Sequence, residues 1–498
     1  MRRYTFLLAS VALSATLLSG PSFARDADTL IIAQEAEPVG LDLMRSSLQT
    51  TMSVAYNIHD TLFQPNEDAS ISPRLAEKWE RVDELTWRVT LRKGATFHDG
   101  SPVNAAAVKF SFDRMNDPAL KSPHLSKISA FKRIEIVDDH TLIIGTEKPY
   151  APGLYMLAYY LPIVPPKAVA AAGPDGYNAK PVGSGPYRVV RWSPGEEVVL
   201  EAYAGYWGPK PAYKKVIFRT IPDESARNAA LLTGEVDIIS GIPMHQRKRI
   251  AASGRAYLTN QLGNMPYLGL NTYQPPLNDV RVRRAVNHAI DRDKINQGLF
   301  EGKAIKVSGA FSPRTFGHDP ALKPYAYDPV RAKALLTEAG YPNGFPVRLT
   351  FPTYIPQIQE QTEAIASDLA KVGIKVTLEP LERAVMWDNY KAGKNQMFVY
   401  WWDDAPEPDR YIYPLLNSKS RDYYYKNTKV DELLDRARTV MVRGEREKVY
   451  QAVDRMIMED APWGFLYVIP EVFGVANGVA YEGRRDGFLD VRTAKPKR

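Results

Sequence analysis

The length of the chain is the strongest constraint on its fold. A single hydrophobic core rarely serves more than about 250 to 300 residues, and this chain has 498. Hydrophobic residues make up 45% of it and charged residues 24%, a balance typical of folded proteins. We therefore expect two or three globular units, each with its own core.

The first residues predict export. Arg2 and Arg3 precede an apolar run over 6–18, and the small-x-small sequence at 22–24 follows, which is the pattern of a cleavable signal peptide. The apolar run is shorter than the roughly 20 residues that cross a bilayer. No cysteine follows the leader to carry a lipid. We predict cleavage after Ala24 and a mature protein free in the periplasm.

Composition argues against several classes of protein. The absence of cysteine excludes disulfides, thiolate metal sites and iron–sulfur clusters. The formal net charge of +7 falls to +5 once Arg2 and Arg3 are removed, and the remaining Lys and Arg residues are interspersed with Asp and Glu. A nucleic-acid-binding protein needs a concentrated basic face, so we expect no nucleic-acid partner.

The common catalytic signatures are missing. The chain contains no Gly-x-Ser-x-Gly elbow, His-Glu-x-x-His pair, Walker loop or Gly-x-Gly-x-x-Gly fingerprint, and its seven histidines are isolated. We expect no metal, no cofactor and no catalysis. An exported hydrolase that uses carboxylates such as Asp404 and Glu407 is the alternative class, and turnover as opposed to stoichiometric capture distinguishes the two.

Periodicity in the second half is typical of α/β structure. Apolar or small residues at 358, 362, 365, 369 and 372 recur at helical spacing, Gly373 ends the helix, and 374–378 alternate as a strand. A helix followed by a strand is typical of α/β folds. Earlier in the chain, 181–186 is the densest Pro/Gly segment and predicts either a crossover between domains or an ordinary turn.

One aromatic run differs from the rest of the chain. Residues 398–402 form a strand-like segment that ends in two tryptophans, and a Pro-containing loop with four carboxylates follows at 403–409. Indole rings followed by carboxylates favour a pocket for an apolar, cationic ligand. A core strand followed by a solvated acidic turn is the alternative.

Several segments together resemble one known family. They are 76–80 (AEKWE), 86–100 (TWRVTLRKGATFHDG), 108–114 (VKFSFDR), 183–187 (GSGPY), 205–208 (GYWG), 268–271 (LGLN) and 280–286 (VRVRRAV). These segments are similar to the extracellular solute-binding proteins of family 5, which include the dipeptide- and oligopeptide-binding receptors of ABC importers. The resemblance runs from about Leu30 to the C-terminus.

This resemblance implies an architecture. The fold would be an α/β, two-lobed periplasmic binding protein of type II, similar to cluster C, with an extra domain inserted in the first lobe. The implied ranges are 1–24 for the signal peptide, 25–50 with 181–262 and 470–498 for lobe one, 51–180 for the extra domain and 263–469 for lobe two. The protein would be a monomer that closes on its ligand about a hinge near 182–186 and delivers that ligand to membrane permease subunits.

The resemblance also implies ligand contacts. In the family's peptide receptors the ligand lies between the lobes, and its backbone pairs with extended segments. An aspartate binds its amino group. The pattern Trp-x-x-Asp falls on Trp401 to Asp404, so Asp404 is the expected amine anchor. The matching extended segments are Glu35, Ala36 and Glu37 in one lobe and Tyr400, Trp401 and Trp402 in the other.

One departure leaves the ligand open. Dipeptide receptors carry an arginine for the ligand carboxylate where this chain has Gln359 and Glu360. Neither side chain can form the two parallel hydrogen bonds that an arginine donates to a carboxylate. The ligand could be a longer peptide, a compound without a carboxylate, an opine or another small amine. Glutathione, haem and oligosaccharides also stay open, as does a chaperone or signalling role, because one fold hosts many sites.

Overall fold

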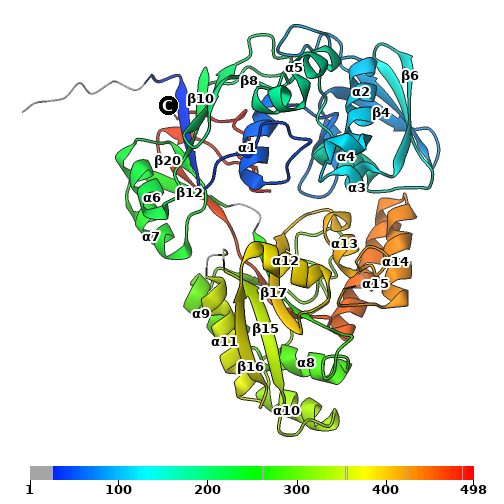
Figure 1. Cartoon of the computed structure of the whole chain (residues 1–498), viewed down its shortest axis with the longest axis vertical. Helices are drawn as coiled ribbons and strands as arrows, with labels where there is room; N and C mark the ends of the chain where they lie inside the picture. The colour runs from blue at the N-terminus through cyan, green and yellow to red at the C-terminus, as the bar shows by residue number, and fades with distance from the viewer. Residues whose placement is uncertain are drawn as a thin grey trace, which may run out of the picture.

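The computed structural model describes residues 26–260, 263–353, 355, 357–421, 423–484 and 486–497, so the predicted leader and its cleavage site lie outside the described residues. Helices and strands are mixed along the chain. Figure 1 shows a seven-stranded and a four-stranded sheet in the upper half of the molecule and a five-stranded sheet in the lower half.

The seven-stranded sheet combines three distant parts of the sequence. In spatial order its strands are β12 (Ala256–Asn260), β20 (Val472–Ala476), β11 (Ile238–Ile239), β1 (Thr29–Gln34), β10 (Lys215–Thr220), β9 (Glu197–Ala202) and β8 (Tyr187–Ser193). Helices α6 (Glu224–Thr233) and α7 (Met244–Ala252) belong to it, and α1 (Gln49–Ile58) packs against β8. β1 is fully buried and runs parallel to both β10 and β11, as expected of a central strand covered on both faces.

The four-stranded sheet is antiparallel and local in sequence. Its order is β4 (Ala76–Arg81), β5 (Thr86–Leu91), β7 (Thr141–Thr146) and β6 (Phe131–Asp138). With it belong β2 (Phe63–Pro65), β3 (Ile71–Pro73), α2 (Ala105–Asn116), the short helix Pro118–Leu120, α3 (Leu125–Ile128), α4 (Gly153–Tyr160) and α5 (Pro166–Ala179). Asn104 caps α2 by accepting the N–H of Ala107 at 3.0 Å, as its residue type predicts.

The five-stranded sheet forms the lower half. Its order is β16 (Lys375–Leu381), β15 (Pro346–Pro352), β17 (Met397–Asp403), β13 (Asn264–Leu270) and β18 (Trp463–Phe465), with the pair β14 (Ile305–Lys306) and β19 (Tyr467–Val468) beside it. Its helices are α8 (Val280–Ala289), α9 (Arg292–Phe300), α10 (Pro329–Glu338), α11 (Ile358–Ala370), α12 (Arg383–Lys391), the short helix Pro408–Arg410, α13 (Ile412–Leu416), α14 (Thr428–Thr439) and α15 (Arg443–Asp460). The predicted helix and strand near 358–378 are confirmed as α11 and β16.

These sheets support the division of the chain that the resemblance implied. We propose that 25–50, 181–262 and 470–498 form lobe one, that 51–180 form the extra domain and that 263–469 form lobe two. These three names are used below for those ranges.

The two lobes are joined by two neighbouring crossings. β12 leads into β13 through 260–264, and β19 leads back into β20 through 468–472. The crossings pair with each other, because the N–H of Asn264 donates to Ile469 O at 3.1 Å and the N–H of Ile469 donates to Asn264 O at 2.8 Å. The predicted hinge near 182–186 is therefore wrong: that segment joins α5 to β8 and does not reach lobe two.

The Pro/Gly segment serves close packing instead. A Cβ on Gly183 would lie 2.0 Å from the carbonyl oxygen of Ile58, and one on Gly185 would lie 2.7 Å from that of Asn57. The N–H of Gly185 donates to Ile58 O at 2.8 Å. Glycines at these two positions let the segment lie directly against the end of α1.

We expect Gly183→Ala to lower the free energy of unfolding by about 1–3 kcal/mol or more, because its Cβ would meet a backbone atom that cannot rotate away. The control is Gly444→Ala in α15, where a Cβ meets no atom within 4 Å and helix propensity favours alanine. Chemical denaturation of both variants measures the difference. Equal stabilities would show that the backbone at position 183 has room for a Cβ beside the carbonyl oxygen of Ile58.

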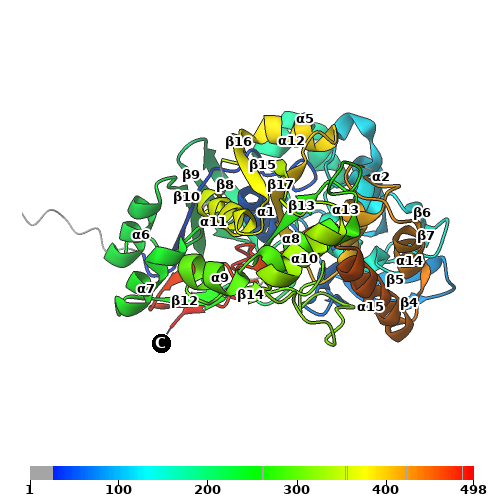
Figure 2. The same ribbon diagram turned by 90° about the horizontal axis from the view of Figure 1, so that it is seen from below.

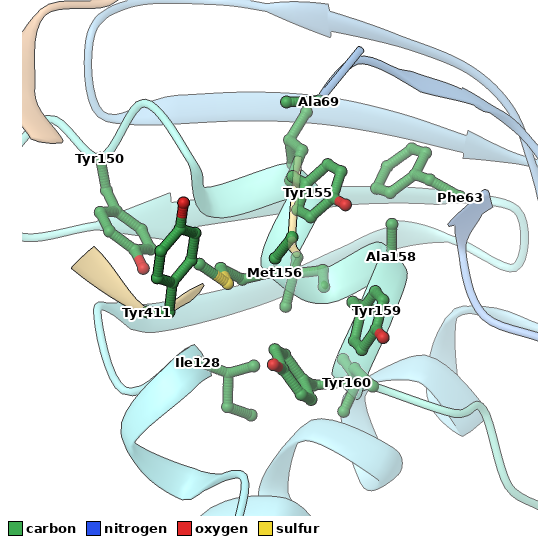
Figure 3. Close-up of a cluster of buried hydrophobic side chains, with 14 of the residues drawn as sticks. Phe63, Ala69, Ile128, Tyr150, Tyr155, Met156, Ala158, Tyr159, Tyr160 and Tyr411 are labelled. Carbon is green, nitrogen blue, oxygen red and sulfur yellow. The ribbon is translucent and has the colours of Figure 1, made fainter. Parts of the chain in front are cut away.

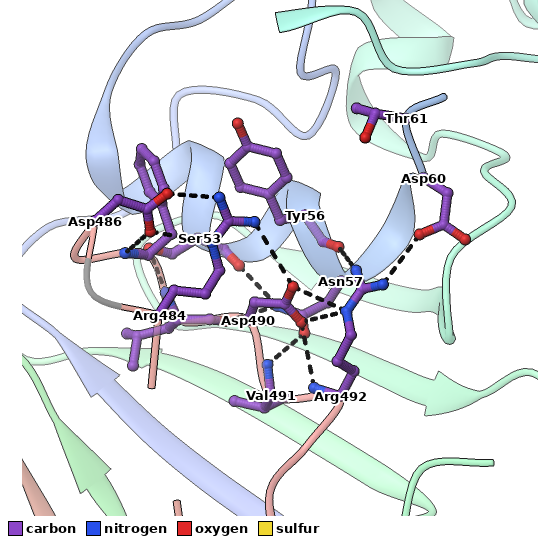
Figure 4. Close-up of polar contacts among 12 residues, drawn as sticks. Ser53, Tyr56, Asn57, Asp60, Thr61, Arg484, Asp486, Asp490, Val491 and Arg492 are labelled. Atoms are coloured by element: carbon purple, nitrogen blue, oxygen red, sulfur yellow. Dashed lines mark hydrogen bonds and ion pairs between the residues drawn. The ribbon is translucent and has the colours of Figure 1, made fainter. Parts of the chain in front are cut away.

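The C-terminal segment is fastened to α1 by buried polar contacts (Figure 4). Asn57 donates to Leu489 O at 2.8 Å and accepts the N–H of Val491 at 2.9 Å. Arg492 lies 3.1 Å from the carboxylate of Asp60. The last strands, β21 (Val479–Ala480) and β22 (Lys495–Pro496), pair with each other. The C-terminus thereby completes lobe one.

The extra domain also packs directly on lobe two. Figure 3 shows Tyr411 of lobe two beside Tyr150 and Met156 of the extra domain, within one buried hydrophobic cluster. The Tyr150 hydroxyl donates to Asp409 at 2.8 Å, and the N–H of Ala151 donates to Arg438 O at 2.7 Å. Figures 1 and 2 both place α14 and α15 beside the four-stranded sheet. The two bodies therefore meet away from the paired crossings as well.

Candidate functional site

Asp404 follows the last residue of β17 and is buried. Its side chain is 1% exposed, and its Oδ1 accepts a hydrogen bond from the Ser312 hydroxyl. Its Oδ2 has no hydrogen-bond donor among the described residues, and the nearest cation is Arg314 Nη1 at 3.8 Å. Burial raises the pKa of Asp404, against the hydrogen bond from Ser312 and the charge of Arg314. A cationic group at Oδ2 would stabilise the ionised carboxylate.

The aromatic residues before Asp404 are half-buried, and the ring of Tyr400 contacts two other aromatic rings. The ring of Tyr400 lies 4.9 Å from that of Trp401 and 5.7 Å from that of Tyr390 in α12. Trp402 is also half-buried, and its indole nitrogen has no hydrogen-bond partner among the described residues. The end of β17 therefore carries half-buried aromatic side chains, and the buried indole N–H of Trp402 has no hydrogen-bond partner among the described residues.

Asp403 points away from Asp404. Its side chain is 57% exposed, and its Oδ2 accepts from Arg410 Nη2 at 2.7 Å. Arg410 in turn lies 3.8 Å from the centroid of the Tyr159 ring and donates to the Tyr160 hydroxyl at 3.1 Å. Asp403 is thus linked to the extra domain.

The three residues of the lobe-one segment, Glu35, Ala36 and Glu37, have different contacts. Glu35 is exposed and accepts from the Ser240 hydroxyl at 2.6 Å, and Ala36 is exposed. Glu37 accepts the N–H of Gly195 at 2.5 Å, so it bonds to the turn between β8 and β9 of its own lobe. The charges of Glu35 and Asp403 both raise the pKa of Glu471, so the ends of β1 and β17 each lie within electrostatic reach of Glu471.

Gln359 and Glu360 lie in the first turn of α11 and are exposed. Gln359 donates to Glu363 at 3.0 Å within the same helix. No described contact joins this pair to the residues at the end of β17, so the structure does not bring the two groups together.

Glu471 is a residue that the sequence analysis missed. It lies on the crossing into β20 and accepts from the side-chain amide of Asn264 on the other crossing. Burial and the nearby charges of Glu35 and Asp403 raise its pKa to about 7, against the charge of Arg247 and the hydrogen bond from Asn264. An isolated glutamate gives no sequence signal, because its pKa depends on residues distant in the chain, and Glu35, Arg247 and Asn264 are over 200 positions away.

Glu471 predicts a specific pH dependence. Between the ordinary glutamate pKa of 4.5 and about 7, the folded state binds more protons than the unfolded state, so ionisation of Glu471 lowers stability as pH rises. Glu471→Gln is neutral at every pH. We expect its melting temperature, relative to wild type, to rise between about pH 5 and pH 8. Thermal unfolding at both pH values measures this, and an unchanged difference would contradict it.

Two searches of the described residues found nothing. None of the helices in the described part of the chain is long and apolar enough to cross a membrane. Within the same residues, no three His, Asp or Glu side chains are grouped so that they could hold a metal ion.

Comparison with known proteins decides the family. Residues 70–423 match the model of the bacterial extracellular solute-binding proteins, family 5. The chain belongs to this family. The glutathione-binding protein GsiB of Pectobacterium atrosepticum is 30% identical over 476 residues, which covers 92% of each protein.

Solved structures of similar proteins have the same fold. The periplasmic binding protein DppA of Helicobacter pylori, in complex with the peptide STSA, matches with a TM-score of 0.81 and 30% identity over 94% of this chain and 98% of that one. AgaA of A. tumefacien R10, in complex with agropinic acid, matches with a TM-score of 0.79 and 29% identity over 94% and 99%. The predicted α/β, type II periplasmic binding fold is confirmed.

Proposed function

We propose that this protein is the periplasmic substrate-binding component of an ABC importer and that it captures a peptide or peptide-like molecule between its lobes. Asp404 is the residue that carries this proposal. It is a buried carboxylate with one oxygen that lacks a donor among the described residues, and it follows the half-buried aromatic side chains at the end of β17. An ammonium group of the ligand would supply the hydrogen-bond donor that Oδ2 lacks, and its charge would add to that of Arg314 at 3.8 Å.

The segments on either side of Asp404 support extended binding. The outer residues Tyr400, Trp401 and Trp402 of β17 and the segment Glu35, Ala36 and Glu37 are the proposed strands for the ligand backbone. Main-chain hydrogen bonds give affinity that depends little on the ligand's side chains. Gln359 and Glu360 are proposed to contact the ligand once the lobes close.

The proposal includes export and excludes catalysis. The leader supports cleavage after Ala24 and a periplasmic location, since the family consists of extracellular proteins. The relatives are binding proteins by name, and we propose that this chain likewise turns over no substrate. Permease subunits in the membrane would be its macromolecular partners, and the protein would act as a monomer.

Equilibrium dialysis against a mixture of short peptides, glutathione and opines tests this proposal. We expect one compound to be retained at one molecule per chain and to be recovered chemically unchanged. Small-angle scattering should then show a smaller radius of gyration with that compound bound, because the lobes close about the paired crossings. Release of a reaction product would favour the hydrolase instead.

A further inference from the structure

Arg314 is the nearest cation to Asp404, but the two side chains do not form a close ion pair. Nη1 of Arg314 lies 3.8 Å from Oδ2 of Asp404, about 1 Å farther than the 2.7–2.9 Å of a charge-assisted hydrogen bond. Among the described residues, Oδ2 has no hydrogen-bond donor, and the guanidinium has no hydrogen-bond acceptor. Each side chain therefore keeps hydrogen-bonding capacity that the other does not use.

A carboxylate in the same loop as Asp404 shows how a structural ion pair differs. Glu407 accepts hydrogen bonds from both terminal nitrogens of Arg446, one of them at 3.0 Å. Neither partner of that pair is more than 7% exposed, whereas the side chain of Arg314 is 35% exposed. The pair of Asp404 and Arg314 is thus longer and more open than a pair that only holds the loop in place.

The backbone on either side of the pair is fixed. The Ser312 hydroxyl donates to Asp404 and accepts the N–H of Arg314 at 3.1 Å. The Thr315 hydroxyl donates to Ala405 O at 3.3 Å. These bonds tie the segment at 312–315 to the segment at 404–405, so the part of the pair that can adjust is the long side chain of Arg314.

The pair also lies close to the boundary between the lobes. The N–H of Asp404 donates to Gly263 O at 2.9 Å, and Gly263 belongs to the crossing from β12 to β13. Oδ2 is buried in the described conformation, so a ligand would reach it when the lobes part about the crossings. Such a ligand would meet the carboxylate and the guanidinium side by side.

We propose that Asp404 and Arg314 together bind an α-amino acid head group, that is, a free ammonium and a free carboxylate on one carbon, and this inference rests on the proposed function. Because the two groups share a carbon, they can lie along two opposite charges 3.8 Å apart. The ammonium would donate to Oδ2 of Asp404, and the carboxylate would accept two hydrogen bonds from Arg314.

This geometry narrows the substrate class. At the N-terminus of an ordinary peptide, the carbon that carries the amine also carries a neutral carbonyl, which leaves Arg314 without an anion. A residue linked through its side chain, such as a γ-glutamyl residue, keeps both charges. The ligand would therefore be a peptide-like compound with an intact α-amino acid at one end.

Two isomers test the head group directly. γ-Glutamylglycine and α-glutamylglycine have the same composition and charge, but only the γ isomer has a free carboxylate on the carbon that carries the amine. By calorimetry, wild type should bind the γ isomer at least about tenfold more tightly. Arg314→Gln should bind the two isomers alike, and Asp404→Asn should bind both more weakly than wild type does.

The matched control is Arg331→Gln, which replaces a half-exposed arginine of α10 that pairs with Glu338 of the same helix and should keep the preference for the γ isomer. Arg314→Lys keeps the charge without the planar fork and should keep only part of the preference, which preserves the test should Arg314→Gln not fold. Equal, measurable affinities of wild type for the two isomers, or an unchanged preference in Arg314→Gln, would overturn the assignment.

L-Alanine and L-alaninamide separate this inference from peptide capture, because they carry the amine with and without the adjacent carboxylate and form no peptide. Wild type should bind L-alanine more tightly than L-alaninamide, and Arg314→Gln should lose that difference. This result without binding of either glutamylglycine isomer would reject peptide capture and support the head-group site. Failure of wild type to bind any of the four compounds would overturn the head-group site, while equilibrium dialysis would still decide whether the protein captures a ligand.

Discussion

Replacing Asp404 with asparagine should weaken binding of an aminated ligand by at least about tenfold. The carboxylate is buried and its Oδ2 lacks a donor among the described residues, so a ligand ammonium would form a desolvated, charge-assisted pair with it. Truncation of one partner in such a pair typically costs about 2–5 kcal/mol, or roughly 30-fold to several-thousand-fold in affinity. Asparagine keeps the shape and can still accept from Ser312. Calorimetric titration with the ligand found by dialysis measures the loss.

Asp403→Asn is the matched control. Asp403 is 57% exposed and points away from Asp404, so water screens its charge from a ligand at Asp404, whereas its own partner, Arg410, is only 5% exposed. We expect a much smaller loss of affinity than at Asp404. Equal losses at the two positions, or none at Asp404, would show that the amine anchor is assigned to the wrong residue. The unliganded melting temperature should change little in Asp404→Asn and fall in Asp403→Asn, which leaves the buried Arg410 without its carboxylate. The rise on ligand binding should shrink only in Asp404→Asn.

Replacing Asp60 with alanine should lower the free energy of unfolding by about 3–5 kcal/mol. Asp60 is fully buried where the extra domain, lobe one and the C-terminal segment meet. It accepts from Arg74 of the extra domain at 2.6 Å, from Trp207 of lobe one at 2.9 Å and from Arg492 of the C-terminal segment at 3.1 Å. Its removal would leave Arg74, itself 3% exposed, without a counter-charge. Chemical denaturation followed by circular dichroism measures the effect.

The control for Asp60 is Asp113→Ala. Asp113 pairs with Lys109 at 2.7 Å, but both side chains are about half exposed, so the change should stay within about 0.5 kcal/mol. A similar small effect at Asp60 would mean that the junction of Arg74, Trp207 and Arg492 does not hold the C-terminal segment and extra domain together.

Local sequence signals predicted local structure well. Asp328 caps α10 by accepting the N–H of Arg331 at 2.8 Å, and Pro329 occupies the first turn, as the residue types alone predict. The 182–186 segment shows the limit of such signals. Proline and glycine mark a break in regular structure, but whether that break moves or packs depends on the residues opposite it, here Asn57 and Ile58.

Sequence could predict only those parts of the site that are adjacent in the chain. Alternation along a strand separates neighbouring side chains, and the structure leaves Asp403 exposed and Asp404 buried. The residues that reach Asp404 from distant parts of the chain gave no signal in the sequence. Ser312 and Glu471 each lie more than 60 positions from Asp404, and only the tertiary fold brings them near β17.

Native mass spectrometry of the protein from its own periplasm tests the central claim most directly. The account predicts that wild type retains one small molecule per chain, that this molecule contains a free amino group, and that Asp404→Asn purified in the same way has lost it. Wild type and Asp404→Asn that retain the same molecule, or a bound molecule without an amino group, would contradict capture of an aminated ligand at Asp404.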